Sequence, residues 1–266
     1  MDKTTTKILF SIDKFVNSEE VLQAAIAVAK RSFVSLEYIM TDESLSLGNE
    51  SDADVKRNFK SKHGVELEIS KESGTFWKAL ARASEKHAAT LVVAGAQVAK
   101  AGLLGGGMTS KVSGFACPVL YLNESSKWQS PNDILMPLDG NSETRQKFFP
   151  VAHWAKIFYA NVNVLGVKRS NTGDDAKMSH IYAIQGHNYM VERGLRTTVT
   201  EMDANSDIVS VCLKHAETFR SKWMSVLNNG DGILRVSAFQ KVCEEANFPL
   251  LIVPYKEPVG LGGSGY

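Results

Sequence analysis

The chain has 266 residues, enough for two ordinary domains or one large one. Its composition, 44% hydrophobic and 22% charged without a biased tract, is typical of a soluble globular protein and excludes collagen-like and low-complexity classes. The 30 basic and 29 acidic residues leave a net charge of +1, so charge gives no reason to expect a nucleic-acid or membrane partner, and we predict neither.

Cysteine usage and the N-terminus indicate where the protein resides. The three cysteines, Cys117, Cys212 and Cys243, form no CxxC pair, which fits a reducing compartment and argues against a disulfide framework or a thiolate zinc site. The first residues do not read as a signal peptide, and no apolar stretch reaches the roughly 20 residues needed to span a bilayer. We therefore predict a cytoplasmic protein, and we expect Cys117, at a strand entry, and Cys243, on an apolar helix face, to be buried rather than reactive.

The first half alternates strand and helix patterns. It opens with KILFSID, an apolar run that ends in Asp13, and an Asn-Ser-Glu helix start follows at Asn17. The later predicted strands lie at 33–40, 65–70, 91–95 and 116–122, and helical patterns lie at 51–63 and 75–87 and before the last strand.

The second half repeats this order. DILMPLD ends in Asp139, and a second Asn-Ser-Glu start follows at Asn141, with Pro150 expected to kink that helix or shift its start. Later predicted strands lie at 161–167, 195–202, 223–227 and 247–254, and helical patterns lie at 176–193 and 206–219 and before the last strand. The aromatic pairs Phe148–Phe149 and Trp154–Phe158 are expected to pack against the sheet or the other domain.

Each half is therefore a β-α-β-α-β-α-β-α-β unit, which indicates an α/β fold with a mostly parallel sheet covered by helices on both faces. A polar linker around residue 128 divides domain 1 (1–126) from domain 2 (131–258), and a flexible glycine-rich tail (259–266) follows. We expect two separate five-stranded sheets that pack against each other.

The motifs at the ends of each half resemble the universal stress protein family in its tandem, two-domain form. They are the strand-end aspartate before an Asn-Ser-Glu helix start (MPLDGNSE, 136–143), the fourth-strand glycine (VVAGAQ, 92–97) and the last strand begun by Cys-Pro (ACPVLYL, 116–122). The resemblance implies doubly wound domains of strand order 3-2-1-4-5, adenine-nucleotide binding in better-known members, and domain pairing about a pseudo-two-fold axis.

The nucleotide-binding members carry a glycine, two residues, a second glycine, nine residues, and then Gly-Ser or Gly-Thr. Domain 1 matches this pattern in part, because Gly95 stands first but Val98 replaces the second glycine. A glycine cluster just before a helix could still bring backbone amides to phosphate oxygens. The residues that would do so are Gly105, Gly106, Gly107, Thr109 and Ser110. The alternative is a turn in which Thr109 or Ser110 caps its own helix.

Domain 2 departs further from the pattern. Its candidate hydroxyl, Ser237, follows Val236 rather than glycine, and Asp231 would place a negative charge near the phosphates, so we predict no triphosphate binding there. In family members the strand-end aspartate contacts the nucleoside. We expect a structural role for Asp139, while Asp13 could either contact a nucleoside or bond nearby backbone amides.

Catalytic and metal motifs are missing from the sequence. The six histidines lack metal-ligand spacing with cysteines or carboxylates, and no nucleophile elbow or Walker phosphate loop occurs. We therefore predict a non-catalytic stress-response protein that acts through its conformation and through protein partners, or by self-association, at sheet edges or helix faces. The alternative is ATP binding, with slow hydrolysis, by domain 1 alone.

Overall fold

The computed structural model describes residues 7–14, 16–47, 50–97, 107–168, 174–204, 207–228 and 236–257. Domain 1 contains β1 (Lys7–Ile12), α1 (Ser18–Ser32), β2 (Ser35–Met40), α2 (Asp52–His63), β3 (Leu67–Lys71), α3 (Phe76–Lys86), β4 (Ala89–Gly95), α4 (Gly107–Val112) and β5 (Val119–Leu122). The segment 123–132 joins it to the second domain, and the predicted tail from residue 259 lies outside the described residues.

Domain 2 repeats the same order of elements. It contains β6 (Asp133–Leu138), the 3-10 helix η1 (Ser142–Lys147), α5 (Phe148–Phe158), β7 (Asn161–Lys168), α6 (Asp174–Val191), β8 (Thr197–Asp203), α7 (Ile208–Thr218), β9 (Trp223–Asn228), α8 (Val236–Glu245) and β10 (Leu250–Pro254). The strands of each half follow the order 3-2-1-4-5 and are parallel to their neighbours within that half, so the predicted fold class is confirmed.

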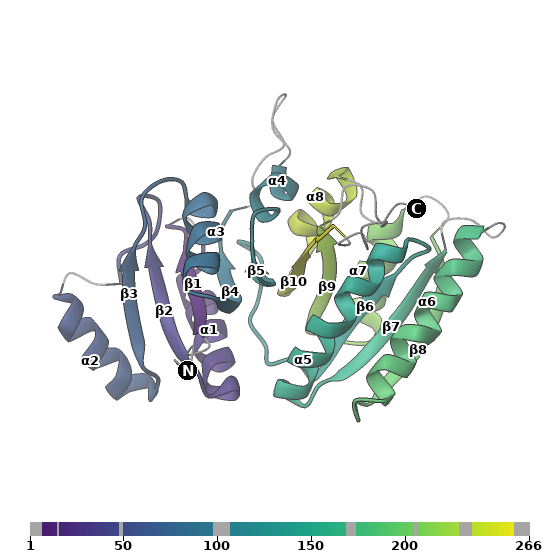
Figure 1. Ribbon diagram of the computed structural model, residues 1–266, viewed down its shortest axis with the longest axis horizontal. Helices are drawn as coiled ribbons and strands as arrows, with labels where there is room; N and C mark the ends of the chain where they lie inside the picture. Colours follow the sequence, from purple (N-terminus) through teal and green to yellow (C-terminus); the bar gives the residue numbers. More distant parts are fainter. Residues whose placement is uncertain are drawn as a thin grey trace, which may run out of the picture.

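The expectation of two separate sheets is wrong. The last strands of the two halves, β5 and β10, pair antiparallel through Tyr121–Leu250 and Val119–Ile252, so all ten strands form one sheet (Figure 1). Both strands are fully buried and apolar. An unpaired apolar edge would leave a row of backbone donors and acceptors without partners, and joining edge to edge satisfies both rows at once.

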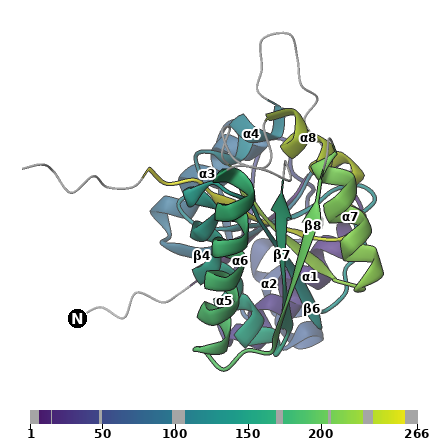
Figure 2. The same cartoon turned by 90° about the vertical axis from the view of Figure 1, so that its right-hand side faces the viewer.

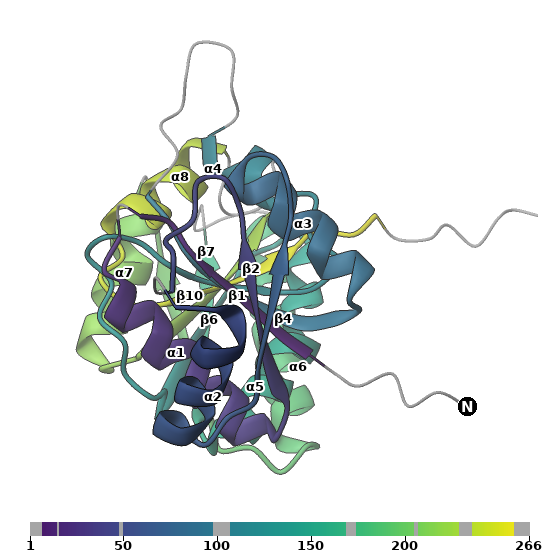
Figure 3. The ribbon, with the colours of Figure 1, turned by 90° about the vertical axis from the view of Figure 1, so that its left-hand side faces the viewer.

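Four helices cover each face of this sheet. The core on one face takes residues from α1, α2, α5 and α6, and the core on the other takes residues from α3, α4, α7 and α8. Figure 2 shows α6 and α7 on opposite sides of β7 and β8, and Figure 3 shows α1 and α3 on opposite sides of β1 and β4. Equivalent helices therefore lie on the same face, which brings α1 beside α5 and α4 beside α8.

The start of the first helix differs between the halves. In domain 1, Asn17 caps α1 by accepting the Glu19 amide at 3.1 Å. In domain 2, Asn141 leads instead into η1, and the α-helix begins only at Phe148, because Pro150 is tolerated in a first helical turn but not further inside. The predicted shift at Pro150 is thus confirmed.

The aromatic residues of this region are mostly buried, but not all. Phe148, Trp154 and Phe158 pack in the core as predicted, whereas Phe149 is 68% exposed. Among the described residues, no helix is long and apolar enough to cross a membrane.

Candidate functional site

The carboxyl ends of β1 and β4 meet at Asp13, where parallel sheets of this kind bind ligands. The Asp13 amide donates to the Gly95 carbonyl at 2.8 Å, and Asp13 also bridges to Ser44 in the segment after β2. The structure therefore brings two of the predicted site residues, Asp13 and Gly95, into direct contact.

Gly95 has a packing role that is independent of any ligand. A β-carbon built at Gly95 would lie 2.1 Å from Cγ2 of Val21, a buried residue in the first turn of α1. The glycine thus lets α1 approach the end of β4, whether or not phosphate also approaches there.

The glycine cluster leads into the short helix α4. Gly107 is its first residue, buried, with a φ of +47° that favours glycine, whereas Gly105 and Gly106 lie outside the described residues. The next amide, that of Met108, donates to Oε1 of Gln240 in domain 2 at 2.8 Å. An amide that would face phosphate in the predicted cradle is therefore bonded by the other domain.

The two predicted hydroxyls do not cap this helix. Thr109 and Ser110 lie inside α4, and the Ser110 hydroxyl donates back to the Gly107 carbonyl at 3.1 Å. The Thr109 hydroxyl is buried without a hydrogen-bond partner among the described residues. The backbone carbonyl of Thr109 accepts a hydrogen bond from Nδ2 of Asn228 in domain 2 at 3.0 Å. The alternative interpretation, in which Thr109 or Ser110 caps its own helix, has no support among the described contacts.

The equivalent corner of domain 2 is closed. Asp139, after β6, is 1% exposed, and Asn141 donates to its two carboxylate oxygens from the backbone amide at 3.3 Å and from Nδ2 at 2.9 Å. Asp139 thus stabilises the turn into η1, which is the structural role predicted for it.

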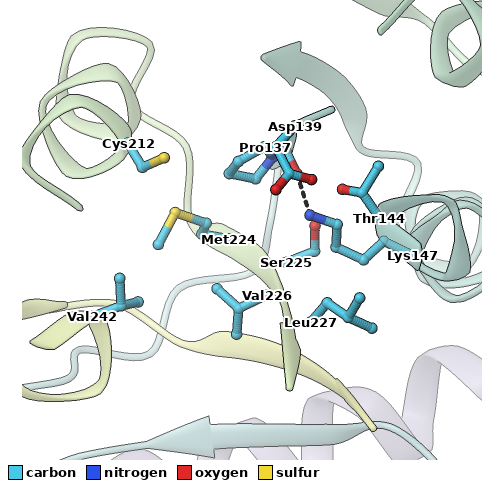
Figure 4. A pocket seen from close by; sticks show the side chains of 10 residues that line it. All are labelled: Pro137, Asp139, Thr144, Lys147, Cys212, Met224, Ser225, Val226, Leu227 and Val242. Carbon is cyan, nitrogen blue, oxygen red and sulfur yellow. Dashed lines mark hydrogen bonds between the residues drawn. The ribbon is translucent and has the colours of Figure 1, made fainter. Parts of the chain in front are cut away.

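Lys147, the last residue of η1, fills the space beside Asp139. Its side chain is buried, and its ammonium group donates to the Pro137 carbonyl (Figure 4). Burial lowers the pKa of Lys147 to about 8, although the charge of Asp139 opposes the change. Below about pH 8 the lysine is therefore a cation beside Asp139.

The cavity that the described residues enclose beside Lys147 is about 20 Å³, room for about one water molecule. Thr144 and Cys212 line it together with Lys147, and the Thr144 hydroxyl has no hydrogen-bond partner among the described residues. A nucleoside needs far more space, since small-molecule pockets typically exceed about 300 Å³.

Lys147 is the residue that sequence reasoning missed. It stands directly before the apolar run FFPVA, within reach of the aspartate that ends β6. The signal available in the sequence was a lysine directly before a run of apolar residues, which indicates that the lysine itself is buried. In the rest of this corner, Ser237 lies in the first turn of α8, and Asp231 is outside the described residues.

The other reactive residue types form no second site. All three cysteines are free and buried; burial raises the pKa of the Cys117 and Cys212 thiols to about 12 and raises that of Cys243 as well. The predicted burial of Cys117 and Cys243 is confirmed. Within the described ranges, no group of three or more histidine, cysteine, aspartate or glutamate side chains could hold a metal ion.

Comparison with known proteins gives a match in structure only. Neither the models of known protein families nor the curated proteins match this chain. Among solved structures, a universal stress protein from Archaeoglobus fulgidus DSM 4304 matches at a TM-score of 0.65 and 12% identity, over 94% of this chain and 97% of that one.

Two chains from Pseudomonas aeruginosa match in the same way. A chain from strain UCBPP-PA14 that also carries the universal stress protein name gives a TM-score of 0.63 at 11% identity, over 94% of both chains. A functionally unknown protein from strain PAO1 gives 0.61 at 12% identity, over 95% of this chain and 94% of that one. The resemblance to tandem universal stress proteins is therefore confirmed for the fold, over nearly the whole chain.

Proposed function

We propose that this chain is a non-catalytic stress-response protein that acts in the cytoplasm through its conformation and its protein partners, with a degenerate nucleotide site. The observation that carries the proposal is Lys147, whose buried side chain, together with the described residues around it, encloses a cavity of about 20 Å³ beside Asp139. Within the described residues, a position filled by the protein's own cation leaves no room there for a nucleoside.

Two contacts in domain 1 point the same way. Gln240 bonds the Met108 amide at the start of α4, and Val21 packs where Gly95 lacks a side chain. The first contact occupies an amide, and the second explains a glycine, that would otherwise indicate phosphate binding. Partner binding then falls to the helix faces and to the outer sheet edges at β3 and β8, because β5 and β10 cover each other.

The alternative is that domain 1 alone binds ATP and hydrolyses it slowly. It is favoured by the contact of Asp13 with Gly95 and by the buried Thr109 hydroxyl, which has no partner among the described residues. These groups would meet the nucleoside and the phosphates respectively.

The test is to denature the purified protein, analyse any released nucleotide, and titrate the native protein with ATP and adenosine by calorimetry. We expect no released nucleotide and no ATP affinity in the millimolar range. Under the alternative, Asp13→Ala weakens binding of both ligands. Thr109→Ala then weakens ATP binding alone, by about 1 kcal/mol or somewhat more, and the exposed Thr218→Ala leaves binding unchanged. ATP binding with this pattern of losses would replace our proposal with the alternative.

A further inference from the structure

Two exposed aromatic side chains occupy equivalent, strained positions in the two domains. Phe33 ends α1 and Tyr159 ends α5, each with a φ of 56° in the left-handed region. Phe33 is 94% exposed and Tyr159 is 85% exposed. Glycine is the usual residue at such helix ends, because a bulky side chain is strained there. The fold thus carries strain at two positions where the core gains almost nothing.

Both residues border one hollow of about 470 Å³, which we call the Phe33–Tyr159 hollow. It forms where α1 and α5 lie side by side (Figure 1). The half-buried Ile157 and the buried Phe158 contribute to its apolar lining. Two aromatic side chains from different domains therefore border one shared concave surface; they stand just before β2 and β7, whereas the nucleotide-type corners follow β1 and β6.

The charges at this hollow are all of one sign. Of the described residues that line it, Lys30 and Arg31 are charged and none is acidic. Both are exposed, and neither forms an ion pair with another described residue. Burial and then the positive charges of Lys62 and Lys30 hold the pKa of His63 below its usual value, so the charge of Lys30 also acts on this neighbouring residue.

A purely structural role explains only part of this arrangement. Lys30 and Arg31 lie in the last turn of α1, where cations offset the helix dipole. The dipole gives no reason for exposed aromatic residues at strained positions in both domains. Strained backbone at an exposed surface is an observation that points toward a functional contact.

The composition of the hollow identifies the kind of occupant. Aromatic residues and arginine dominate the binding energy of protein interfaces, whereas nucleic-acid affinity depends on neutralising many phosphates, and this surface offers two cations. A second copy docked symmetrically would place Lys30 and Arg31 against themselves, which opposes self-association here.

We propose that the Phe33–Tyr159 hollow binds an acidic segment of a partner protein, in which an aromatic or large apolar side chain enters the hollow and neighbouring carboxylates meet Lys30 and Arg31. The inference rests on the proposed function, because it specifies the surface and the chemistry of the partner contact. It adds a site that is separate from the strand ends of both domains.

A random copolymer of glutamate and tyrosine is a direct probe of this chemistry. We expect fluorescence anisotropy to show that the full chain binds the labelled copolymer, binds polyglutamate at least about tenfold more weakly, and ignores a lysine–tyrosine copolymer. The pair Phe33→Gly and Tyr159→Gly should lose at least about tenfold in affinity while its melting temperature rises, since glycine relieves both strained positions.

Matched variants separate the site from general effects. The charge reversals Lys30→Glu and Arg31→Glu should also abolish binding, whereas reversals of the exposed Lys177 and Lys214 should not. Phe149→Ser, which removes a 68% exposed aromatic residue elsewhere, should leave binding unchanged.

Three results would overturn the inference. The first is a wild type that ignores the glutamate–tyrosine copolymer, or a glycine pair that binds it as well as the wild type does. The second is binding of single-stranded oligothymidylate, instead of the copolymer, through the same residues. The third is a dimer that the glycine pair dissociates. In each case the nucleotide-release measurement is independent, so a nucleotide-free protein keeps the proposed function while losing this surface.

Discussion

Replacing Lys147 tests how the closed corner of domain 2 is held. The pKa of its buried ammonium group lies at about 8, against the usual 10.5 of an unfolded lysine. Between these values the unfolded chain holds a proton that the folded chain lacks, so stability rises with pH from about 8 to about 10.5. Below about 8 both states are protonated, and the cost of burying the charge is fully present. At about 1.4 kcal/mol for each pKa unit, this cost is about 3 kcal/mol.

Two variants separate the lysine from its partner charge. Lys147→Met alone should destabilise the protein by about 3 kcal/mol or more, because it leaves the buried Asp139 carboxylate without its neighbouring cation. Adding Asp139→Asn removes both charges at similar volume. This double variant should equal or exceed the wild type at pH 7, by up to about 3 kcal/mol, and the difference should close as the pH rises to about 10.5.

The assay is urea unfolding followed by tryptophan fluorescence at several pH values between about 7 and 10.5. At each pH the free energy of unfolding of a variant is subtracted from that of the wild type, because the contributions of the other titrating groups are common to both proteins and cancel. The exposed Lys214→Met is the control and should track the wild type throughout. If the wild type and the double variant run parallel over the whole pH range, the ammonium group of Lys147 is not buried and the reasoning fails.

Three further predictions follow from other contacts. Gly95→Ala should lower the free energy of unfolding in urea by about 1–3 kcal/mol, because its β-carbon would overlap Val21. Adding Val21→Ala should restore part of the loss, whereas the control Gly114→Ala, whose β-carbon would have its nearest contact at 3.6 Å, should lower it little. Phe33→Gly should stabilise the fold by about 1 kcal/mol by removing left-handed strain, and an unchanged or lower melting temperature would contradict this. The three cysteines should resist a thiol reagent in the native protein at neutral pH, where burial keeps them protonated, and react fully in urea; native reaction would show that one is accessible.

The features that depend on local sequence could be predicted. The alternation of strand and helix patterns indicated both domains, because the apolar residues of each strand and helix are determined by which side of the sheet they face. Pro150 could be expected to shift the start of its helix, since proline is excluded from helix interiors wherever the chain folds.

The features that depend on contacts between distant residues could not be predicted in the same way. The pairing of β5 with β10, and the bond from the Met108 amide to Gln240, join segments more than a hundred residues apart. The apolar sequences of the last strands predicted that these strands are buried. A strand buried within its own half and a strand paired with the other half have the same apolar pattern, so the sequence could not distinguish the two. The same limit applies to Lys147, whose partner charge lies in another element.

The strand pairing defines which residues of the two corners correspond. Ile8 pairs with Leu91 in domain 1, and Ile134 pairs with Trp223 in domain 2. Counting four residues on from Leu91 and from Trp223 makes Gly95 equivalent to Leu227. Phe33 and Tyr159 are the left-handed residues that follow the first helix of each domain. Val21 and Lys147 each lie 12 residues before them, so these two positions are equivalent.

These two exchanges together account for the asymmetry of the domains. In domain 1 the absence of a side chain at Gly95 lets Val21 pack directly against the end of β4. In domain 2 the buried Leu227 occupies that position, Pro150 delays the start of the α-helix, and the chain takes a 3-10 turn that ends in Lys147. The long lysine side chain then reaches back over Leu227 to the strand end and fills the corner. Loss of the glycine and the filling of the described part of the domain 2 corner by Lys147 thus occur together, at positions that correspond in the two domains.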